Sequence, residues 1–226
     1  MVVQVWWLRL RWFESRVTLA RPTEYKKFLC NIKGLISLCT KAFNITDITV
    51  NRMSGSPNDG FNKEKFKQVL HYIIASCGHI ENVGKTVLFK LPYFSDFNYY
   101  ELYEEKLTGE SYTHIPHGPA PRHFDEIILE LMSECKISHF KTMYYGREQN
   151  KYVSLIEPTT DLLNQKELGV INDVLDKCSK MNATEISDLS HMDMPYKATK
   201  PGCEIDYDLV FYRDALTSVR NYDEND

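Results

Sequence analysis

Four side chains in this sequence are candidates for a metal site. His114 and His117 lie three residues apart, and His191 and Asp96 offer further nitrogen and oxygen donors. Such ligands around an open coordination position would suit a metal-dependent hydrolase. The spacing matches no recognisable metal motif, so the alternative is that His117 hydrogen-bonds the backbone of a Gly-Pro turn and the other side chains lie on the surface. The second interpretation is favoured, and the hydrolase remains the rival hypothesis.

The common catalytic fingerprints are absent from the sequence. It has no glycine-rich dinucleotide motif, no zinc-protease helix motif and no nucleophile elbow. Gly84-Lys85-Thr86 matches the end of a phosphate-loop pattern, but His79 stands where the first glycine should be. None of the six cysteines forms a CxxC pair or lies beside a histidine that would activate it. We therefore expect a protein that is not an enzyme and that uses no metal or cofactor.

Aromatic residues gather in one stretch: Tyr93, Phe94, Phe97, Tyr99, Tyr100, Tyr103 and Tyr112. At helical spacing they occupy two faces of one helix, so either both faces are buried or one face contacts a partner protein. Stacking on nucleic-acid bases is a third option. The acidic residues of the stretch, which are Asp96, Glu101, Glu104 and Glu105, outweigh its lysines, which are Lys85, Lys90 and Lys106. This balance disfavours nucleic acid.

The composition is that of a weakly acidic globular protein. The chain has 226 residues, 43% of them hydrophobic, and a formal net charge of -4. It therefore has no global positive field to hold nucleic acid or an anionic membrane. No apolar run approaches the roughly 18 residues of a membrane helix. With no recognisable secretory signal, the cysteines are interpreted as reduced thiols of a cytoplasmic protein that does not contact a membrane.

Residues 1–60 are interpreted as an N-terminal extension. Its helical spacing predicts one amphipathic helix at about 24–42, and a Gly/Ser/Pro/Asn linker covers 54–60. Either Met1 or Met53 could be the start of the working protein. A single helix without a helix-turn-helix gives little support to a DNA-binding autoregulator.

The main domain is predicted to cover 61–218, followed by an acidic tail at 219–226. Asn62 is expected to cap a helix that runs to about residue 77. A second helix is expected at about 83–106, kinked or broken at Pro92 and ended by Gly109. A short extended segment at 110–117 then leads into a stiff turn at 118–121.

The rest of the domain alternates helices with one hairpin. A helix is expected at about 122–135, and β-forming runs at 140–145 and 152–156 predict a hairpin with a longer loop. Asn164 and Asn182 each begin a capping box before a helix. A loop is expected around 195–202 and a last helix at about 206–219. The predicted fold class is mainly α (α+β), a compact helical domain with a small β-hairpin element.

Several motifs resemble one known family. The run Lys90-Leu-Pro-Tyr-Phe-Ser-Asp96 is similar to the Lys-Leu-Leu-Tyr-Phe-Ala-Asp helix of the SocA-like antitoxin domain, also called the Panacea domain. Further motifs follow in the family's order: Tyr99-Tyr100, Thr108-Gly109, Tyr112, His117-Gly118-Pro119-Ala120-Pro121, Glu167-Leu168, Leu189-Ser190-His191, Gly202 and Ile205-Asp206-Tyr207. The likeness spans about 62–210. It departs at Pro92, where the family has an apolar helix former, and at Tyr196, near a usual tryptophan.

The resemblance implies a small, non-catalytic, mainly α domain that serves as the antitoxin of a toxin–antitoxin pair and neutralises its toxin by direct binding. Related domains also occur in phage-associated proteins. The implied partner is a cognate toxin protein, and a protease or DNA are weaker candidates. The residues that it marks as signature or partner-binding candidates are Lys90, Tyr93, Phe94, Asp96, Tyr99, Tyr100, Gly109, Tyr112, His117, Gly118, Pro119 and His191.

Overall fold

The structure is a computed structural model that describes residues 60–220. The helix predicted at 24–42, the body of the linker and the acidic tail lie outside the described residues. The domain boundaries and the choice between Met1 and Met53 therefore stay predictions.

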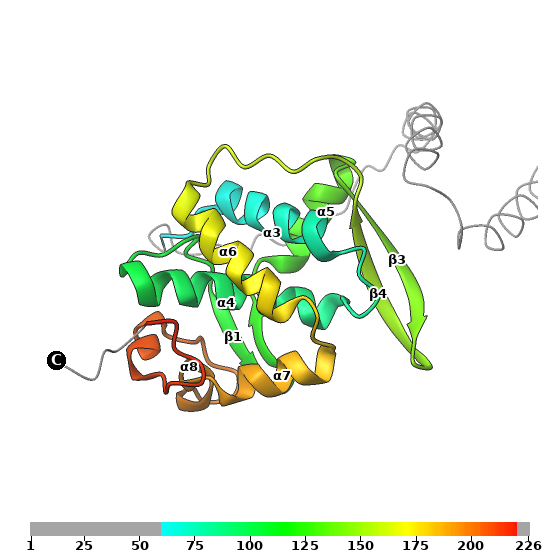
Figure 1. Cartoon of the computed structure of the whole chain (residues 1–226). Helices are drawn as coiled ribbons and strands as arrows, with labels where there is room; N and C mark the ends of the chain where they lie inside the picture. The colour runs from blue at the N-terminus through cyan, green and yellow to red at the C-terminus, as the bar shows by residue number, and fades with distance from the viewer. Residues whose placement is uncertain (1–59, 221–226) are drawn as a thin grey trace, which may run out of the picture. The chain divides into compact units, whose positions relative to one another are not determined.

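The described residues form a mainly helical fold with two small antiparallel hairpins (Figure 1). The helices are α3 (Lys63–Cys77), α4 (Lys85–Tyr103), α5 (Phe124–Ser133), α6 (Gln165–Cys178), α7 (Ala183–Met192), α8 (Met194–Ala198) and the 3-10 helix η2 (Tyr207–Tyr212). The strands are β1 (Tyr112–Ile115), β2 (Gly118–Pro121), β3 (Ile137–Tyr144) and β4 (Arg147–Ser154). The predicted fold class is confirmed, with a second hairpin that the sequence pattern did not indicate.

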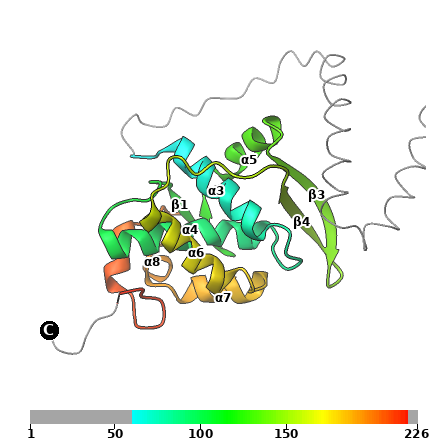
Figure 2. The same cartoon turned by 45° about the horizontal axis from the view of Figure 1, so that its top comes forward.

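Helix α4 is the central element. It packs against α3, α6, α7, β2, β4 and η2, and Figures 1 and 2 show it in the middle of the fold. From Val87 to Phe97 every residue is buried except Phe89, which is half-buried. A helix that is apolar on every side must be enclosed by its neighbours. Of the two alternatives for the aromatic stretch, burial on both faces therefore holds for this part of α4.

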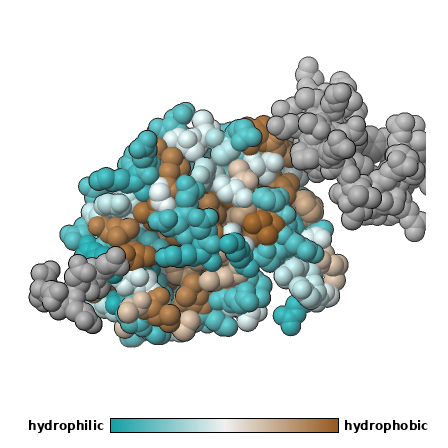
Figure 3. Space-filling model, in the orientation of Figure 1, coloured by the Kyte–Doolittle hydropathy of each residue, from teal (hydrophilic) through white to brown (hydrophobic). Residues whose placement is uncertain are grey.

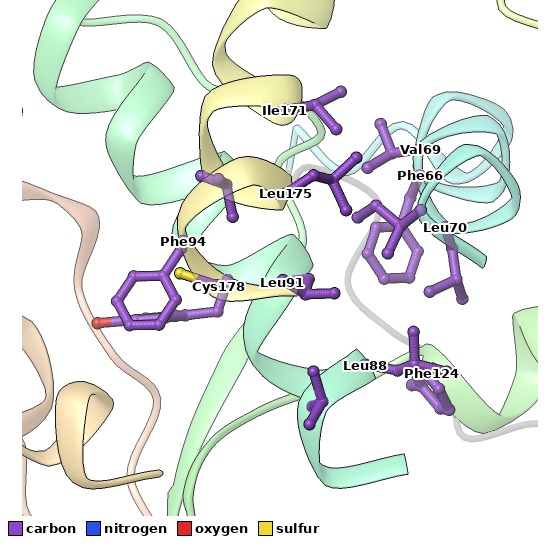
Figure 4. Packing of buried hydrophobic residues seen from close by; sticks show 14 of the residues in the cluster. Phe66, Val69, Leu70, Leu88, Leu91, Phe94, Phe124, Ile171, Leu175 and Cys178 are labelled. Carbon is purple, nitrogen blue, oxygen red and sulfur yellow. The ribbon is translucent and has the colours of Figure 1, made fainter. Parts of the chain in front are cut away.

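Apolar side chains from four helices meet in one core. Figure 4 shows Phe66 and Leu70 of α3 and Leu88 and Leu91 of α4 beside Phe124 of α5, with α6 contributing Ile171, Leu175 and Cys178. The buried residues of α3 are Phe66, Val69, Leu70, His71, Ile73, Ile74 and Cys77. Burial of apolar area of this kind is the main favourable term in folding.

The predicted break at Pro92 is wrong, because α4 continues through this residue as one helix. Proline removes one backbone hydrogen bond, but the helix is packed on all sides at this point and does not end there. The alternative expectation of a kink at Pro92 stays a prediction. The predicted end at Gly109 is also wrong. The helix ends at Tyr103, where Glu104 adopts φ 59° and its N–H donates to the Tyr100 carbonyl. Gly109 instead forms a later turn at φ 70°, where a Cβ would lie 2.4 Å from the Gly60 carbonyl oxygen.

Asparagine caps begin three helices as the sequence predicts. The Asn62 side chain accepts from the Lys65 N–H at 3.0 Å. Asn164 and Asn182 each form a complete capping box with the glutamate three residues later. These caps satisfy backbone N–H groups that have no intrahelical partner, which fixes where α3, α6 and α7 start.

The segment Gly118–Pro121 is a strand and not the expected turn. It pairs with β1, with Tyr112 opposite Pro121 and His114 opposite Pro119. Because the Arg122 N–H donates to the Ser111 carbonyl, alternation along the ladder places both prolines on pairs that exchange no hydrogen bonds. The other edge of β1 bonds to residues 202–205. An edge strand tolerates prolines in this way.

The second hairpin is longer and tighter than predicted. Its strands pair from Ile137 opposite Ser154 to Tyr144 opposite Arg147, which leaves only Tyr145 and Gly146 in the loop. Both loop residues have positive φ, 46° and 74°, as in a type I′ turn. Residues 147–150, for which a longer loop was expected, are therefore part of β4.

Three helix predictions need smaller corrections. α5 ends at Ser133, so Met132 is exposed at the helix end and Cys135 lies beyond it at φ 55°. The loop expected around 195–202 contains the short helix α8, which Pro195 can begin because the first turn needs no N–H from it. The last helix expected at 206–219 is reduced to η2.

We predict that Gly118→Ala lowers the free energy of unfolding by about 2–3 kcal/mol, from backbone strain and overpacking. Gly118 has φ +94°, and a Cβ there would lie 2.4 Å from Ser190 Oγ and 2.8 Å from Lys90 Cε. The matched control is Gly169→Ala in α6, where no atom lies within 4 Å. That change should raise the free energy of unfolding by about 0.5–1 kcal/mol. Urea denaturation measures both, and equal effects at the two sites would refute this assignment.

Candidate functional site

Most of the family-like signature residues are internal. Lys90, Tyr93, Phe94, Asp96, Tyr99, Gly109, Tyr112, Gly118 and Pro119 are buried, whereas Tyr100 and His191 are partly buried and His117 is exposed. Tyr100 also has an internal partner, since its hydroxyl donates to Asp208 at 2.6 Å. The set therefore positions elements around α4 and does not form a continuous surface.

Asp96 ties α4 to the segment that follows it. Its carboxylate accepts from the Thr108 N–H at 2.9 Å and from the Tyr112 hydroxyl at 2.5 Å, and the Thr108 hydroxyl donates to both of its oxygens. Burial raises the pKa of Asp96 to about 7, and these donors oppose that rise. The three residues fasten the turn after α4 and the start of β1 to the centre of the fold.

Lys90 lies in the same helix without such partners. Its side chain is fully buried, and Nζ makes no hydrogen bond within the described part of the chain. Burial alone lowers the pKa of Lys90 to about 8, because the charged form loses its hydration. The ammonium lies beside Gly118 of β2, close to Ser190 of α7. Gly118 thus provides the space that the lysine needs.

A buried ionic cluster holds the C-terminal segment against α4. The Arg213 guanidinium donates from Nε and Nη2 to the two oxygens of Asp193 at 2.8 and 2.7 Å, and from Nη1 to Glu101 at 2.8 Å. The Tyr93 hydroxyl also donates to Asp193, at 2.8 Å. Although burial opposes its charge, Asp193 and Glu101 keep the pKa of Arg213 above its usual value. A paired and fully hydrogen-bonded cluster is the form in which such charges tolerate burial.

No pattern in the sequence indicates the roles of Arg213 and Asp193. Glu101, one of the acidic residues that disfavour nucleic acid in the aromatic stretch, is buried in this cluster. Arg213 and Glu101 are 112 positions apart, so no local spacing connects them. The sequence signal for this cluster is limited to charged residues that stand among apolar or aromatic neighbours along the chain.

The candidate histidines do not form a set of three metal ligands. His114 and His191 both stack on the Tyr196 ring, at centroid distances of 3.8 and 4.9 Å, and His114 Nδ1 lies 2.9 Å from the Thr199 carbonyl oxygen. His117 is exposed, and its backbone carbonyl accepts from Ser187. Residues 60–220 contain no group of three or more His, Cys, Asp or Glu side chains placed to hold a metal ion. A metal site built from these histidines and Asp96 is therefore wrong.

The buried thiols have environments that oppose ionisation. Burial raises the pKa of Cys77 to about 12 and that of Cys178 to about 11. Cys135 and Cys203 are exposed free thiols. A nucleophilic cysteine needs a lowered pKa, so Cys77 and Cys178 are packing residues. Within residues 60–220, none of the helices has the length and apolar character needed to cross a bilayer.

Removing the arginine should expose the cost of the buried cluster. We predict that Arg213→Leu lowers the free energy of unfolding by about 3–5 kcal/mol, since it leaves two buried carboxylates without their cation. Arg220→Leu is the control, because its pair with Glu104 lies at the surface and should be worth less than about 1 kcal/mol. Chemical denaturation compares the two variants, and a similarly small loss at Arg213 would contradict the structural role of the cluster.

Replacing Lys90 should stabilise the fold, whereas replacing Arg213 should destabilise it. We predict that Lys90→Met raises the free energy of unfolding at pH 7 by about 1–3 kcal/mol, because a buried charge without a partner is removed. Between pH 8 and 10.5 the unfolded chain holds the lysine proton longer than the folded chain does. The stability of the unaltered protein therefore rises with pH across this window, and the advantage of the variant shrinks.

Lys151→Met is the matched control for that experiment. Lys151 is also buried, but its Nζ donates to the carbonyls of Ile80 and Val83 at 2.5 and 2.7 Å. Its replacement should destabilise the fold, since two buried carbonyls lose their donor. Thermal unfolding at pH 7 and pH 10 separates the two lysines. Destabilisation by Lys90→Met at pH 7 would show that Lys90 is favourably paired.

One comparison with known proteins finds a match. Residues 88–197 match the family model described as antitoxin SocA-like, Panacea domain. This range begins within α4 and ends in α8. It therefore contains the contacts of Asp96 with Thr108 and Tyr112, both hairpins, and Asp193 of the ionic cluster. No curated protein and no solved structure matches the chain. The resemblance to the SocA-like antitoxin family, inferred from the ordered motifs, is thus confirmed by the family model over residues 88–197.

Proposed function

We propose that this chain is the antitoxin of a toxin–antitoxin pair and neutralises its toxin by direct binding. The observation that carries the proposal is the family match over 88–197. The match includes the Lys90–Asp96 run and the Gly118–Pro121 strand, on which the fold depends.

The chemistry of the described residues supports binding over catalysis. Asp96 and Asp193 are held by internal hydrogen bonds and ion pairs, so neither is free to act as a general base on a bound substrate. The buried thiols have raised pKa values. Of the three histidines considered as metal ligands, His114 and His191 stack on Tyr196 and His117 is exposed. We infer that the domain acts through its surface, by covering a functional part of the toxin.

The surface also suits a partner that is specific and not purely apolar. On the face shown in Figure 3, apolar residues lie in separate groups among hydrophilic ones. Interfaces between proteins that also exist apart are about as apolar as ordinary surface and gain specificity from polar contacts. Autoregulation through DNA stays a second proposal, which depends on residues 1–60 and is tested by a gel shift on upstream DNA at stated salt.

Co-expression with the neighbouring gene product tests the proposal. We predict that this product arrests growth when expressed alone, that the full chain restores growth, and that the two proteins co-purify. Arg213→Leu is the control, because a chain that folds poorly should not restore growth. A neighbour that is harmless alone, or that never co-purifies with the chain, would contradict the antitoxin role.

A further inference from the structure

The tip of the β3–β4 hairpin carries a residue that the fold itself does not favour. Tyr145 is the first residue of the two-residue loop and has φ 46°. Asparagine or glycine is preferred at this position, because the left-handed conformation strains a residue with a bulky side chain. Its side chain is 90% exposed and so adds little to the core. Strain at an exposed residue suggests a role outside folding.

The residues beside Tyr145 are of the types that dominate protein interfaces. Met143 is 63% exposed and Phe140 45% exposed, and the Tyr144 ring packs edge-on against Tyr145 at 4.7 Å. Arg147 is exposed and has no acidic partner within residues 60–220. Tyrosine, methionine, phenylalanine and arginine are all enriched at such interfaces. Figures 1 and 2 both show the hairpin projecting from the helical body.

A groove of about 540 Å³ lies beside this hairpin. Tyr144, Arg147 and Gln149 line it from the hairpin, and the first residues of α4 and α7 line it from the body. α4 begins at Gly84 without a side-chain cap, so N–H groups at its start lack a side-chain acceptor. The Gln149 side chain packs against Gly84 at this helix start and donates from Nε2 to the Asn82 carbonyl at 3.2 Å. The groove is therefore walled by the hairpin on one side and by the starts of two helices on the other.

The charges around the groove decide which kind of partner fits. Lys85 is paired with Asp125, and Glu148 is paired with Lys141. Among the basic residues that line the groove, Arg147 is then left without an acidic partner within residues 60–220. Glu81 lines the adjoining hollow beside Tyr144. The groove has no excess of positive charge for a polyanion such as nucleic acid. One carboxylate next to an apolar side chain matches it better.

We propose that the hairpin tip and this groove, which we call the hairpin site, are the surface that binds the toxin. The occupant is a surface segment of the toxin with an acidic side chain for Arg147 and an apolar one for Tyr144 and Tyr145. This inference rests on the proposed function and specifies where that binding takes place. It assigns the signature residues around α4 to the scaffold and the binding energy to Tyr145 and its neighbours.

The substitution Tyr145→Asn separates binding from folding, because the two should change in opposite directions. Asparagine relieves the backbone strain, so the melting temperature should rise by about 1–3 °C. The affinity for the co-purifying toxin should fall about tenfold or more, as expected for an aromatic hot spot. Arg147→Glu should weaken binding as well, with a greater loss at low salt, while leaving the melting temperature within about 1 °C.

Tyr212→Asn is the matched control. Tyr212 is 71% exposed and lies at the end of η2, outside the hairpin site. Its replacement should leave the affinity within about twofold of the unaltered chain, measured by calorimetry on the full-length proteins. If Tyr145→Asn binds the toxin as tightly as the unaltered chain, the hairpin site is wrong while the antitoxin function stands.

Other outcomes would also overturn the assignment of the hairpin site as the toxin-binding surface. A lower melting temperature for Tyr145→Asn would show that the tyrosine serves the fold, which overturns the argument from strain. A dimer of the unaltered chain that Tyr145→Asn converts to monomer in light scattering would make the hairpin a self-contact, and binding of DNA lost in the same variant would make it a nucleic-acid surface. Failure of the unaltered chain to bind the toxin overturns the proposed function, and this inference with it.

Discussion

Burial of α4 on all sides over residues 87–97 is the constraint on which the rest of the structure depends. A helix in this position leaves each polar side chain along it to find an internal partner or to destabilise the fold. Asp96 is satisfied by Thr108 and Tyr112, and Glu101 by Arg213, whereas Lys90 has only the space left by Gly118. The surroundings of Asp96, Glu101 and Lys90 determine where the turn after α4, the C-terminal segment and β2 must lie.

This constraint separates two kinds of residue that sequence motifs do not distinguish. The Lys90–Asp96 run and the Gly118–Pro121 strand lie within the range that matches the family model, and both belong to the packing in and around α4. Residues that bind a partner must instead be accessible, and the β3–β4 hairpin supplies aromatic and charged side chains that pack little against the core. The motifs that are easiest to recognise in the sequence therefore belong to the scaffold here. The proposed binding depends on residues of the β3–β4 hairpin, which form no recognisable motif.

Local rules predicted the parts of this structure that are decided locally. Asn62, Asn164 and Asn182 begin helices because a capping side chain acts within three residues. Tertiary contacts decided the rest: packing keeps α4 continuous through Pro92, pairing with β1 makes Gly118–Pro121 a strand, and Arg213 reaches Glu101 across the fold. Of the candidate site residues, the sequence identified those around α4 but not their burial, and it did not single out Tyr145, whose strain is visible only in the backbone conformation.

Hydrogen exchange of the full chain, free and bound to its co-purifying toxin, tests the central claim most directly. The claim is that α4 and its neighbours form a scaffold and that the partner binds elsewhere. The amides of α4 beyond its first turn should exchange slowest in the free chain and change little on binding, and new protection should appear in residues 137–154 and at the starts of α4 and α7, which line the groove. New protection confined to residues 89–121, with the hairpin unchanged, would contradict the account.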